Sequence, residues 1–212
     1  MMGYSQSKLA AEYIISSASK VGANATVLRI GQIIPGRHRG TKLWNPSEAV
    51  PLMIRSASKD SAGALPILDI GHDTCDWIEA DTLADTILQL AGIDHTVDST
   101  ELVYNLVNPR TFSWKDHLLP SLLRAGRKFD TVPWQEWIER LQASTEDVNT
   151  NPSRKLLEFW RKQTQRKGRI TFDTATAEAS SPALRASMRL VDDNFIEQVL
   201  EAWKTHEIAV KA

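Results

Sequence analysis

A tyrosine and a lysine stand four residues apart near the start of the chain, as Tyr4 and Lys8. In a helix, positions i and i+4 lie on the same face, so the phenol and the ammonium would point into the same space. A nearby positive charge stabilises a phenolate, which suits the phenol to give a proton to a carbonyl oxygen that receives hydride. The spacing alone fits a solvated pair on an exposed helix equally well, so other features must decide.

Further candidate binding residues follow along the chain. Gly31 and Gln32 come directly after an apolar run, and Arg37 and His38 lie in the polar and basic stretch of residues 35–40. The two basic side chains could contact a phosphate group, although a short basic loop is more often simply solvated. Trp44 follows this loop, so we expect it to border the same binding cleft.

His72, Cys75 and Asp76 superficially suggest a metal site. No second pair of ligands follows them at a suitable spacing, so we predict no metal site.

An amphipathic helix must carry the tyrosine and the lysine. Apolar residues recur at helical spacing within residues 5–20, and Gly22 follows as a stop signal. Residues 25–30 are rich in apolar and β-branched side chains and predict a largely buried strand, and residues 102–107 predict a second one. A helix followed closely by a buried strand is half of a parallel α/β unit.

The rest of the chain is predicted to be mostly helical. Helices are expected at residues 47–57 and 82–91, with an extended piece at residues 66–70. The C-terminal half carries cap or first-turn signals for four further helices: Ser113 with Asp116, Pro133, Asn151 before Pro152, and Ser181 before Pro182. A last helix, residues 193–205, aligns Phe195, Val199 and Trp203 on one face.

Composition excludes several classes of protein. The 212 residues include 25 Lys and Arg against 26 Asp and Glu, a net charge of -1 with the two signs interspersed, so no nucleic acid is expected as a partner. The single cysteine, Cys75, excludes an internal disulfide framework and suits a reducing compartment. No stretch is long and apolar enough for a membrane span or a signal peptide, so a cytoplasmic location is expected.

Taken together, ordered segments of the chain resemble thioester reductase domains. These are extended short-chain dehydrogenase/reductases at the C-termini of nonribosomal peptide synthetases, synthetase-like adenylating reductases and carboxylic acid reductases. The similarity spans essentially the whole chain, and its specificity rests on the order and number of the segments. They are Met2 to Lys8, Leu28 to Ile33, Trp44-Asn45 with Pro51 to Ser56, Asp76-Trp77-Ile78 with Asp81, Tyr104 to Pro109, Val132-Pro133-Trp134 with Trp137, Asn151-Pro152 with Leu156-Leu157, and Ser181 to Leu184.

The resemblance implies roles for matching positions. Tyr4 would be the proton donor to the substrate carbonyl, and Lys8 would bind ribose hydroxyls of the cofactor and favour ionisation of the phenol. The segment of residues 28–33 would run close to the nicotinamide, which makes Gly31 and Gln32 candidate cofactor-binding residues. The substrate would be a phosphopantetheine thioester on a carrier protein. The reaction would be its NADPH-dependent release as an aldehyde or an alcohol. Apart from the resemblance, we take Arg37, His38, Trp44 and Trp77 as the candidate substrate-binding residues.

One departure from the family pattern is large. The chain contains no G-x-G-x-x-G or G-x-x-G-x-x-G turn for the pyrophosphate, and it lacks the strand that would bring the family's catalytic Ser or Thr. We therefore expect an α/β fold that is the C-terminal remnant of an extended reductase Rossmann fold plus a mostly helical substrate-binding domain. Residues 1–35 would be the residual Rossmann helix and strand, and residues 36–212 the substrate-binding portion.

Three functions follow from this departure. The chain could be the substrate-binding portion of a thioester reductase that is not redox-active alone and binds no cofactor in isolation. It could instead be a truncated reductase recruited as a cofactor-independent isomerase, cyclase or condensing enzyme in natural-product biosynthesis, acting on a small molecule. The third alternative is a non-catalytic module that docks a carrier protein.

The predicted strand of residues 25–30 raises a problem of stability. A strand that is buried on both faces needs flanking strands and covering helices, and most of these have no counterpart in the sequence. We expect the chain to compensate by forming a homodimer or by folding its own elements over the gap.

Overall fold

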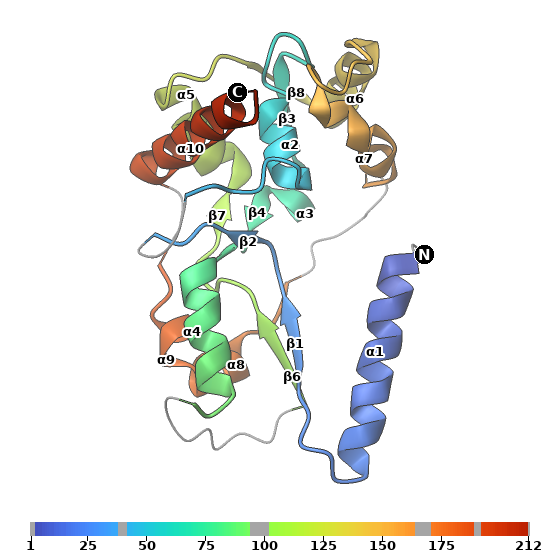
Figure 1. Cartoon of the computed structure of the whole chain (residues 1–212), viewed down its shortest axis with the longest axis vertical. Helices are drawn as coiled ribbons and strands as arrows, with labels where there is room; N and C mark the ends of the chain where they lie inside the picture. The colour runs from blue at the N-terminus through green and yellow to red at the C-terminus, as the bar shows by residue number, and fades with distance from the viewer. Residues whose placement is uncertain (1–2, 38–41, 94–101, 164–170, 189–191, 212) are drawn as a thin grey trace. The chain divides into compact units, whose positions relative to one another are not determined.

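The computed structural model describes residues 3–37, 42–93, 102–163, 171–188 and 192–211 (Figure 1). It divides the chain into two compact units, each built from three separate segments. Unit 1 comprises Met1–Ile33, Asp76–Arg110 and Phe172–Met188, and unit 2 comprises Ile34–Cys75, Thr111–Thr171 and Arg189–Ala212. The boundary predicted between residues 35 and 36 separates two expected roles, and it stays a prediction. The two compact units are a different division, because their segments alternate along the chain.

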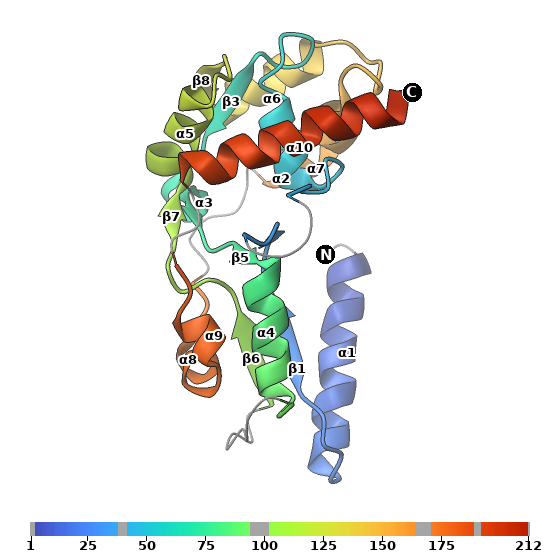
Figure 2. The same ribbon diagram turned by 60° about the vertical axis from the view of Figure 1, so that its left-hand side comes forward.

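Unit 1 is organised around two parallel strands. Strand β1 (Val27–Ile30) pairs with β6 (Val103–Leu106), with Leu28 opposite Tyr104 and Arg29 opposite Asn105. Helix α1 (Gly3–Lys20) precedes β1 and runs beside it in both views (Figures 1 and 2).

The end of α1 explains how the chain turns into β1. Gly22 has a φ of 95°, its N–H donates to the carbonyl of Ser19, and the N–H of Ala23 donates to the carbonyl of Ala18. This pair of hydrogen bonds is a Schellman motif, in which glycine takes the left-handed conformation at low cost. The stop predicted at Gly22 is therefore confirmed.

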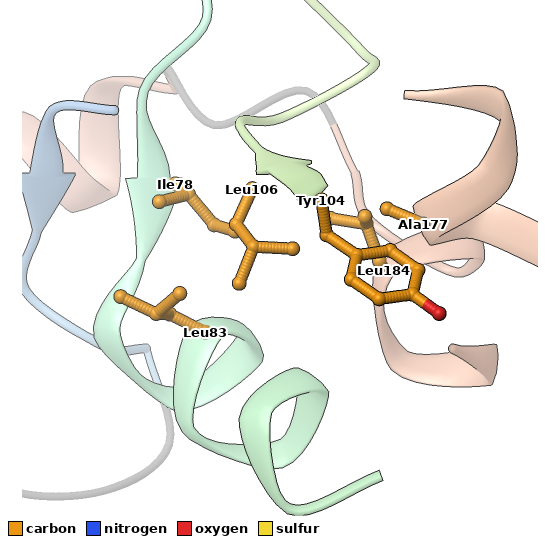
Figure 3. Packing of buried hydrophobic residues seen from close by; sticks show 6 residues of the cluster. All are labelled: Ile78, Leu83, Tyr104, Leu106, Ala177 and Leu184. Atoms are coloured by element: carbon orange, nitrogen blue, oxygen red, sulfur yellow. The ribbon is translucent and has the colours of Figure 1, made fainter. Parts of the chain in front are cut away.

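The core of unit 1 lies on one face of this two-stranded sheet. Helix α4 (Ala80–Leu90) follows the short strand β5 (Ile78–Glu79) and contacts α9 (Pro182–Arg185), which follows α8 (Ala175–Ser180). Their buried side chains gather around β6 (Figure 3), and Leu28, Ile87 and Leu90 pack against them. The buried residues of this cluster are Ile78, Leu83, Tyr104, Leu106, Ala177 and Leu184.

Unit 2 combines short strand pairs with eight helical elements among the described residues. Strands β3 (Ala64–Ile67) and β8 (Asp130–Pro133) pair in parallel, and β4 (Thr74–Cys75) pairs antiparallel with β7 (Phe112–Ser113). Helix α10 (Asp193–Lys211) packs beside α5 (Figure 2). The other helical elements are α2 (Ala49–Arg55), α3 (Ile70–Asp73), the π-helical η1 (Trp114–Leu118), α5 (Leu119–Arg124), α6 (Trp134–Ala143), and the 3-10 turn η2 (Pro152–Leu156), which leads into α7 (Leu157–Gln163). Strand β2 (Ile33–Ile34) stands where the chain passes from one unit to the next.

Tryptophans form much of the core of unit 2. Trp137 lies between Trp134 and Trp160, with ring centroids 5.1 and 4.9 Å away, and its Nε1 donates to Ser56 Oγ at 2.9 Å. Trp114 Nε1 donates to the carbonyl of Pro66 at 2.9 Å. Large aromatic rings supply much buried area, and the N–H groups of Trp137 and Trp114 are satisfied here by a hydroxyl and a carbonyl. Trp137 and Trp160 are fully buried core residues.

Two predicted helix starts are confirmed by their caps. The side chain of Ser113 accepts from the N–H of Asp116 at 2.8 Å, and that of Ser181 accepts from the N–H of Leu184 at 3.1 Å. Asn151 stands at the cap position before Pro152, as predicted, but its side chain makes no cap hydrogen bond. Instead, Asn151 accepts from Ser61 Oγ at 2.6 Å and donates to Ser144 Oγ at 2.7 Å.

Two further expectations need correction. The extended piece predicted at residues 66–70 ends earlier, because Asp69 caps α3 by accepting from the N–H of His72. The strand predicted at residues 25–30 is not largely buried: Val27 and Leu28 are half-buried, while Arg29 and Ile30 are exposed. Among the described residues β1 pairs with β6 alone, so one edge of β1 has no strand beside it.

Candidate functional site

The tyrosine and the lysine share one face of α1, as predicted. The ammonium of Lys8 lies 5.4 Å from the centroid of the Tyr4 ring, within the range of a cation–π contact. Tyr4 is 71% exposed, and every residue from position 3 to position 11 is exposed. The phenol and the ammonium are therefore close to each other and open to a ligand.

Glu12 is the first partly covered residue of α1 and the third member of this face, at i+4 from Lys8. Its carboxylate accepts two hydrogen bonds from Arg29 on β1, from Nε at 2.9 Å and from Nη2 at 2.6 Å. The hydrogen bonds from Arg29 hold the pKa of Glu12 below its ordinary range, and the same bonds raise the pKa of Arg29. Sequence reasoning missed this pair, although a charged residue inside an apolar strand was a signal for it.

Gly31 lies where β1 ends, and its N–H donates to the carbonyl of Leu106 at 3.2 Å. A Cβ at this position would stand 2.6 Å from Cγ1 of Val107, a distance that real Cβ contacts do not reach. Glycine is therefore required here by the close approach of two chain segments. This packing accounts for Gly31 whether or not a cofactor lies nearby.

Gln32 follows Gly31 and takes part in local hydrogen bonds. Its backbone carbonyl accepts from the N–H of Ile78 at 2.9 Å, and its side-chain Nε2 donates to the carbonyl of Ile33 at 2.8 Å. The backbone of Gln32 therefore fixes the start of β5, and its role toward a cofactor stays a prediction.

The residues predicted to bind substrate have packing partners of their own. In unit 2, Arg37 donates to Asp192 at 2.8 Å and lies 5.8 Å from the centre of the Phe195 ring. In unit 1, Trp77 is 7% exposed. His38 lies outside the described residues.

Trp44 is a core residue of unit 2. Its ring is 3% exposed and lies 6.5 Å from the ring of Trp203, whose Nε1 donates to the Trp44 carbonyl at 2.6 Å. Little of the ring is left to meet a substrate, so a binding role for Trp44 would need a local rearrangement.

Within the described ranges, no group of three or more His, Cys, Asp and Glu side chains could hold a metal ion. The same residues contain no helix that is long and apolar enough to cross a membrane.

The side chains predicted to bind a nicotinamide cofactor can be tested for their chemical fit to it. A hydroxyl, an ammonium and an amide, from Tyr4, Lys8 and Gln32, are donors that suit ribose hydroxyls and a carboxamide. The pyrophosphate needs backbone N–H groups of a glycine-rich turn at a helix start, and the printed sequence has no such turn. The residues present therefore fit the nicotinamide end of the cofactor and not its phosphates.

Comparisons with known proteins agree on one kind of relative. A family model for an NAD-binding domain, described as "Male sterility protein", matches residues 1–87. The non-canonical non-ribosomal peptide synthetase ascB of Acremonium egyptiacum is 31% identical over 210 residues, which are 96% of this chain and 18% of that protein. A carboxylic acid reductase of Neurospora crassa is 33% identical over 168 residues, which are 75% of this chain and 16% of that protein.

A solved structure supports the fold. The terminal R domain from the myxalamid PKS-NRPS biosynthetic pathway superposes with a TM-score of 0.74 at 22% identity, over 95% of this chain and 49% of that one. The fold class predicted from the sequence is confirmed by this likeness. The chain spans less than a fifth of the two curated relatives named above and about half of the solved domain.

Proposed function

The chain is related to the C-terminal part of thioester reductase domains, and from this relationship we propose that it is the substrate-binding portion of such a reductase. It would act together with a nucleotide-binding part on an acyl or peptidyl thioester held by a carrier protein. The product would be an aldehyde or, after a second reduction, an alcohol. The observation that carries this proposal is the exposed face of α1, where Lys8 lies 5.4 Å from the Tyr4 ring, within a chain that matches a peptide synthetase over 96% of its length.

The proposed reaction places a proton donor beside a carbonyl oxygen. A reduced nicotinamide, when bound, would supply the hydride that goes to the thioester carbon. Tyr4 hydrogen-bonds the carbonyl oxygen and gives it a proton as negative charge develops there, because a phenol within hydrogen-bond reach can act as a general acid. When the carbonyl re-forms, the C–S bond breaks, the thiolate leaves and takes up a proton, and the phenol regains its own from the oxygen.

Lys8 serves this step in two ways. Its ammonium stabilises negative charge on the Tyr4 oxygen, and it supplies donors for the ribose hydroxyls. The 71% exposed phenol needs surrounding groups that exclude water before such a proton transfer becomes efficient. A nucleotide-binding part that covers this face of α1 would supply them.

Four side chains are the proposed substrate contacts. Arg37 and His38 would meet the phosphate of a phosphopantetheine arm. Trp77 would line the path of the acyl chain, and so would Trp44 after a local rearrangement that uncovers its ring. For Arg37 this means sharing its guanidinium between Asp192 and the phosphate. Arginine has five N–H donors, so the existing pair leaves donors for a second anion.

The first test supplies a nucleotide-binding part and measures reductase activity. The chain is joined to the nucleotide-binding part of the myxalamid-pathway reductase domain, and oxidation of NADPH is followed with an acyl-phosphopantetheine thioester. We expect turnover that falls about 10²–10⁴-fold in Tyr4→Phe, the range typical of a lost general acid. Tyr13→Phe is the matched control, because Tyr13 is on the same helix and is 67% exposed. Full turnover in Tyr4→Phe would overturn the proposed role of Tyr4.

The chain by itself gives a second test. We expect no NADPH binding by calorimetry, because the sequence has no glycine-rich turn for the pyrophosphate. Micromolar affinity would contradict the proposal.

A second candidate function is suggested by the segments that match the substrate-binding portion, from Trp44-Asn45 to Ser181–Leu184, all of which the sequence keeps. A reductase fold recruited as a cofactor-independent isomerase, cyclase or condensing enzyme would use these segments without a nucleotide. Turnover of a small natural-product intermediate without nicotinamide, lost in Tyr4→Phe, would favour this candidate over the first.

A further inference from the structure

Helix α1 has few contacts with the sheet of unit 1, and one ion pair is the most specific of them. None of its residues is buried, although it is 18 residues long. Of its large apolar side chains, Leu9, Tyr13 and Ile14 are more than 40% exposed, and Ile15 is half-buried. By contrast, both oxygens of the Glu12 carboxylate accept hydrogen bonds from Arg29 of β1. A planar guanidinium that meets a carboxylate with two parallel bonds fixes both distance and orientation.

Arg29, the sheet residue of this ion pair, is held in place by strand pairing. Arg29 stands opposite Asn105 in the parallel register of β1 and β6, so the two side chains are on the same face of the sheet. Asn105 in turn donates from Nδ2 to the carbonyl of Asp173 at 2.9 Å. The strand position of Arg29 is therefore set by backbone pairing and does not depend on α1.

The attachment point and the proposed proton donor lie on the same side of α1. Tyr4, Lys8 and Glu12 occupy positions i, i+4 and i+8, which follow one another along one face of a helix. Tyr4 stands two turns before Glu12, about 12 Å along the axis at 1.5 Å per residue. Any tilt of α1 at Glu12 is therefore amplified at the phenol.

We propose that Glu12 and Arg29 are positioning residues, which set the direction in which α1 presents Tyr4 and Lys8. This inference rests on the proposed function of Tyr4 as proton donor, and it extends that function to two residues that touch neither substrate nor cofactor. Loss of either charge frees the N-terminal half of α1 to tilt while the core of unit 1 stays folded.

The first experiment measures the position of α1 in the chain as it stands. Spin labels are placed at Gln6→Cys in the N-terminal half of α1 and at Ala84→Cys on α4, both exposed positions, in a Cys75→Ala background, and their distance distribution is recorded by pulsed electron paramagnetic resonance. We expect a narrow distribution that broadens in Glu12→Gln and narrows again when Glu12→Arg is combined with Arg29→Glu. An unchanged distribution in Glu12→Gln would overturn the proposal.

A matched control comes from unit 2. Arg124 makes the same kind of bidentate pair with Asp193 at the start of α10, at 2.7 and 2.9 Å. Helix α10 also buries Phe195, Val199 and Trp203. Asp193→Asn removes a charge of the same type from a helix that has other attachments, so the distances of α10 within unit 2 should not change.

The second experiment asks whether the pair acts through Tyr4. In the joined reductase, Glu12→Gln should lower kcat up to about fivefold, the equilibrium factor typical of an exposed ion pair, with KM unchanged. In the Tyr4→Phe background the same substitution should have no further effect, because its target is gone. An equal fall in both backgrounds would mean a merely structural role and would overturn the proposal.

The two experiments separate this inference from the function on which it rests. If Tyr4→Phe retains full turnover, the role of Tyr4 fails, while the distance measurement still decides whether Glu12 and Arg29 hold α1. If Tyr4→Phe is inactive but Glu12→Gln leaves both distance and turnover unchanged, the proposed function stands and the positioning role fails.

Discussion

The two long helices of unit 1, α1 and α4, are attached to its sheet in opposite ways. Helix α4 buries Leu83 and packs Ile87 and Leu90 into the apolar cluster around β6. Helix α1 buries no residue, and its strongest contact with the sheet is the pair of Glu12 with Arg29. The difference follows from strand alternation, because Leu28 packs on the cluster while its neighbour Arg29 points to the other face.

The two faces of this small sheet therefore have different expected roles, one in stability and the other in the placement of Tyr4. Burial of apolar area provides most of the free energy of folding, whereas an exposed ion pair contributes about 0.2–1 kcal/mol. The α4 face should therefore decide whether unit 1 folds, and the α1 face should decide where Tyr4 points. The variants that follow test this division of roles between the α4 face and the α1 face.

The largest effect is expected in the apolar cluster. Leu106 is fully buried beside α4, so Leu106→Ala should lower the free energy of unfolding by about 2–5 kcal/mol. Ile14→Ala on α1 is the control, because Ile14 is 68% exposed and its loss should change stability by less than about 0.5 kcal/mol. Urea unfolding followed by circular dichroism measures both. Comparable losses of unfolding free energy in the two variants would mean that α1 packs on the sheet as tightly as α4 does.

The next effect is expected at the end of β1. Gly31→Ala places a methyl group against Val107, which should cost about 1–3 kcal/mol by overpacking. Gly3→Ala is the control, because no atom lies within 4 Å of the added Cβ. The double variant with Val107→Ala should recover part of the loss from Gly31→Ala. Simple additivity of the two losses would show that the clash is relieved elsewhere.

A smaller effect is expected where α9 begins. Ser181 caps α9 and also donates to Gln89 Oε1 of α4 at 2.6 Å. Ser181→Ala removes a cap, which typically costs about 0.5–2 kcal/mol, and thermal unfolding would detect it. Ser17→Ala on α1 replaces an exposed serine and should leave the melting temperature unchanged. If Ser181→Ala left the melting temperature unchanged, α9 would contribute little to the stability of the α4 face.

The smallest effect concerns pH. Arg29 lowers the pKa of Glu12 in the folded chain, so the contribution of the pair to holding α1 is complete above the ordinary value of a glutamate, about 4.3. It is lost as the pH falls further through the lowered pKa. The spin-label distance between α1 and α4 should therefore broaden only below about pH 4, and in Glu12→Gln it should be broad at every pH. Broadening near neutral pH would point to a different group.

The sequence predicted the local elements well because their signals are local. Apolar spacing and a glycine stop placed α1, and hydroxyl residues followed by proline or an acidic residue placed the starts of η1 and α9. The positions of Tyr4 and Lys8 on one helix face also follow from spacing alone. These features depend on residues within about one helical turn of one another.

Features that depend on distant residues were missed. The exposure of Arg29 and Ile30 depends on which elements cover β1, and an apolar strand sequence does not contain that information. The buried amide of Asn151 serves Ser61 and Ser144 where its place before a proline suggested a cap. The pairing of Glu12 with Arg29 joins two elements through a turn whose geometry only the structure provides.

The interleaved segments have a consequence for the order in which the chain can fold during its synthesis. Strand β1 is made early, but its partner β6 follows only after the whole stretch of residues 34–75, which belongs to unit 2. The last piece of unit 1, residues 172–188, leaves the ribosome after most of unit 2. Strand β1 must therefore wait without a partner until residues 103–106 have been made, and Ala177 and Leu184 reach the apolar cluster only after residues 111–171 of unit 2.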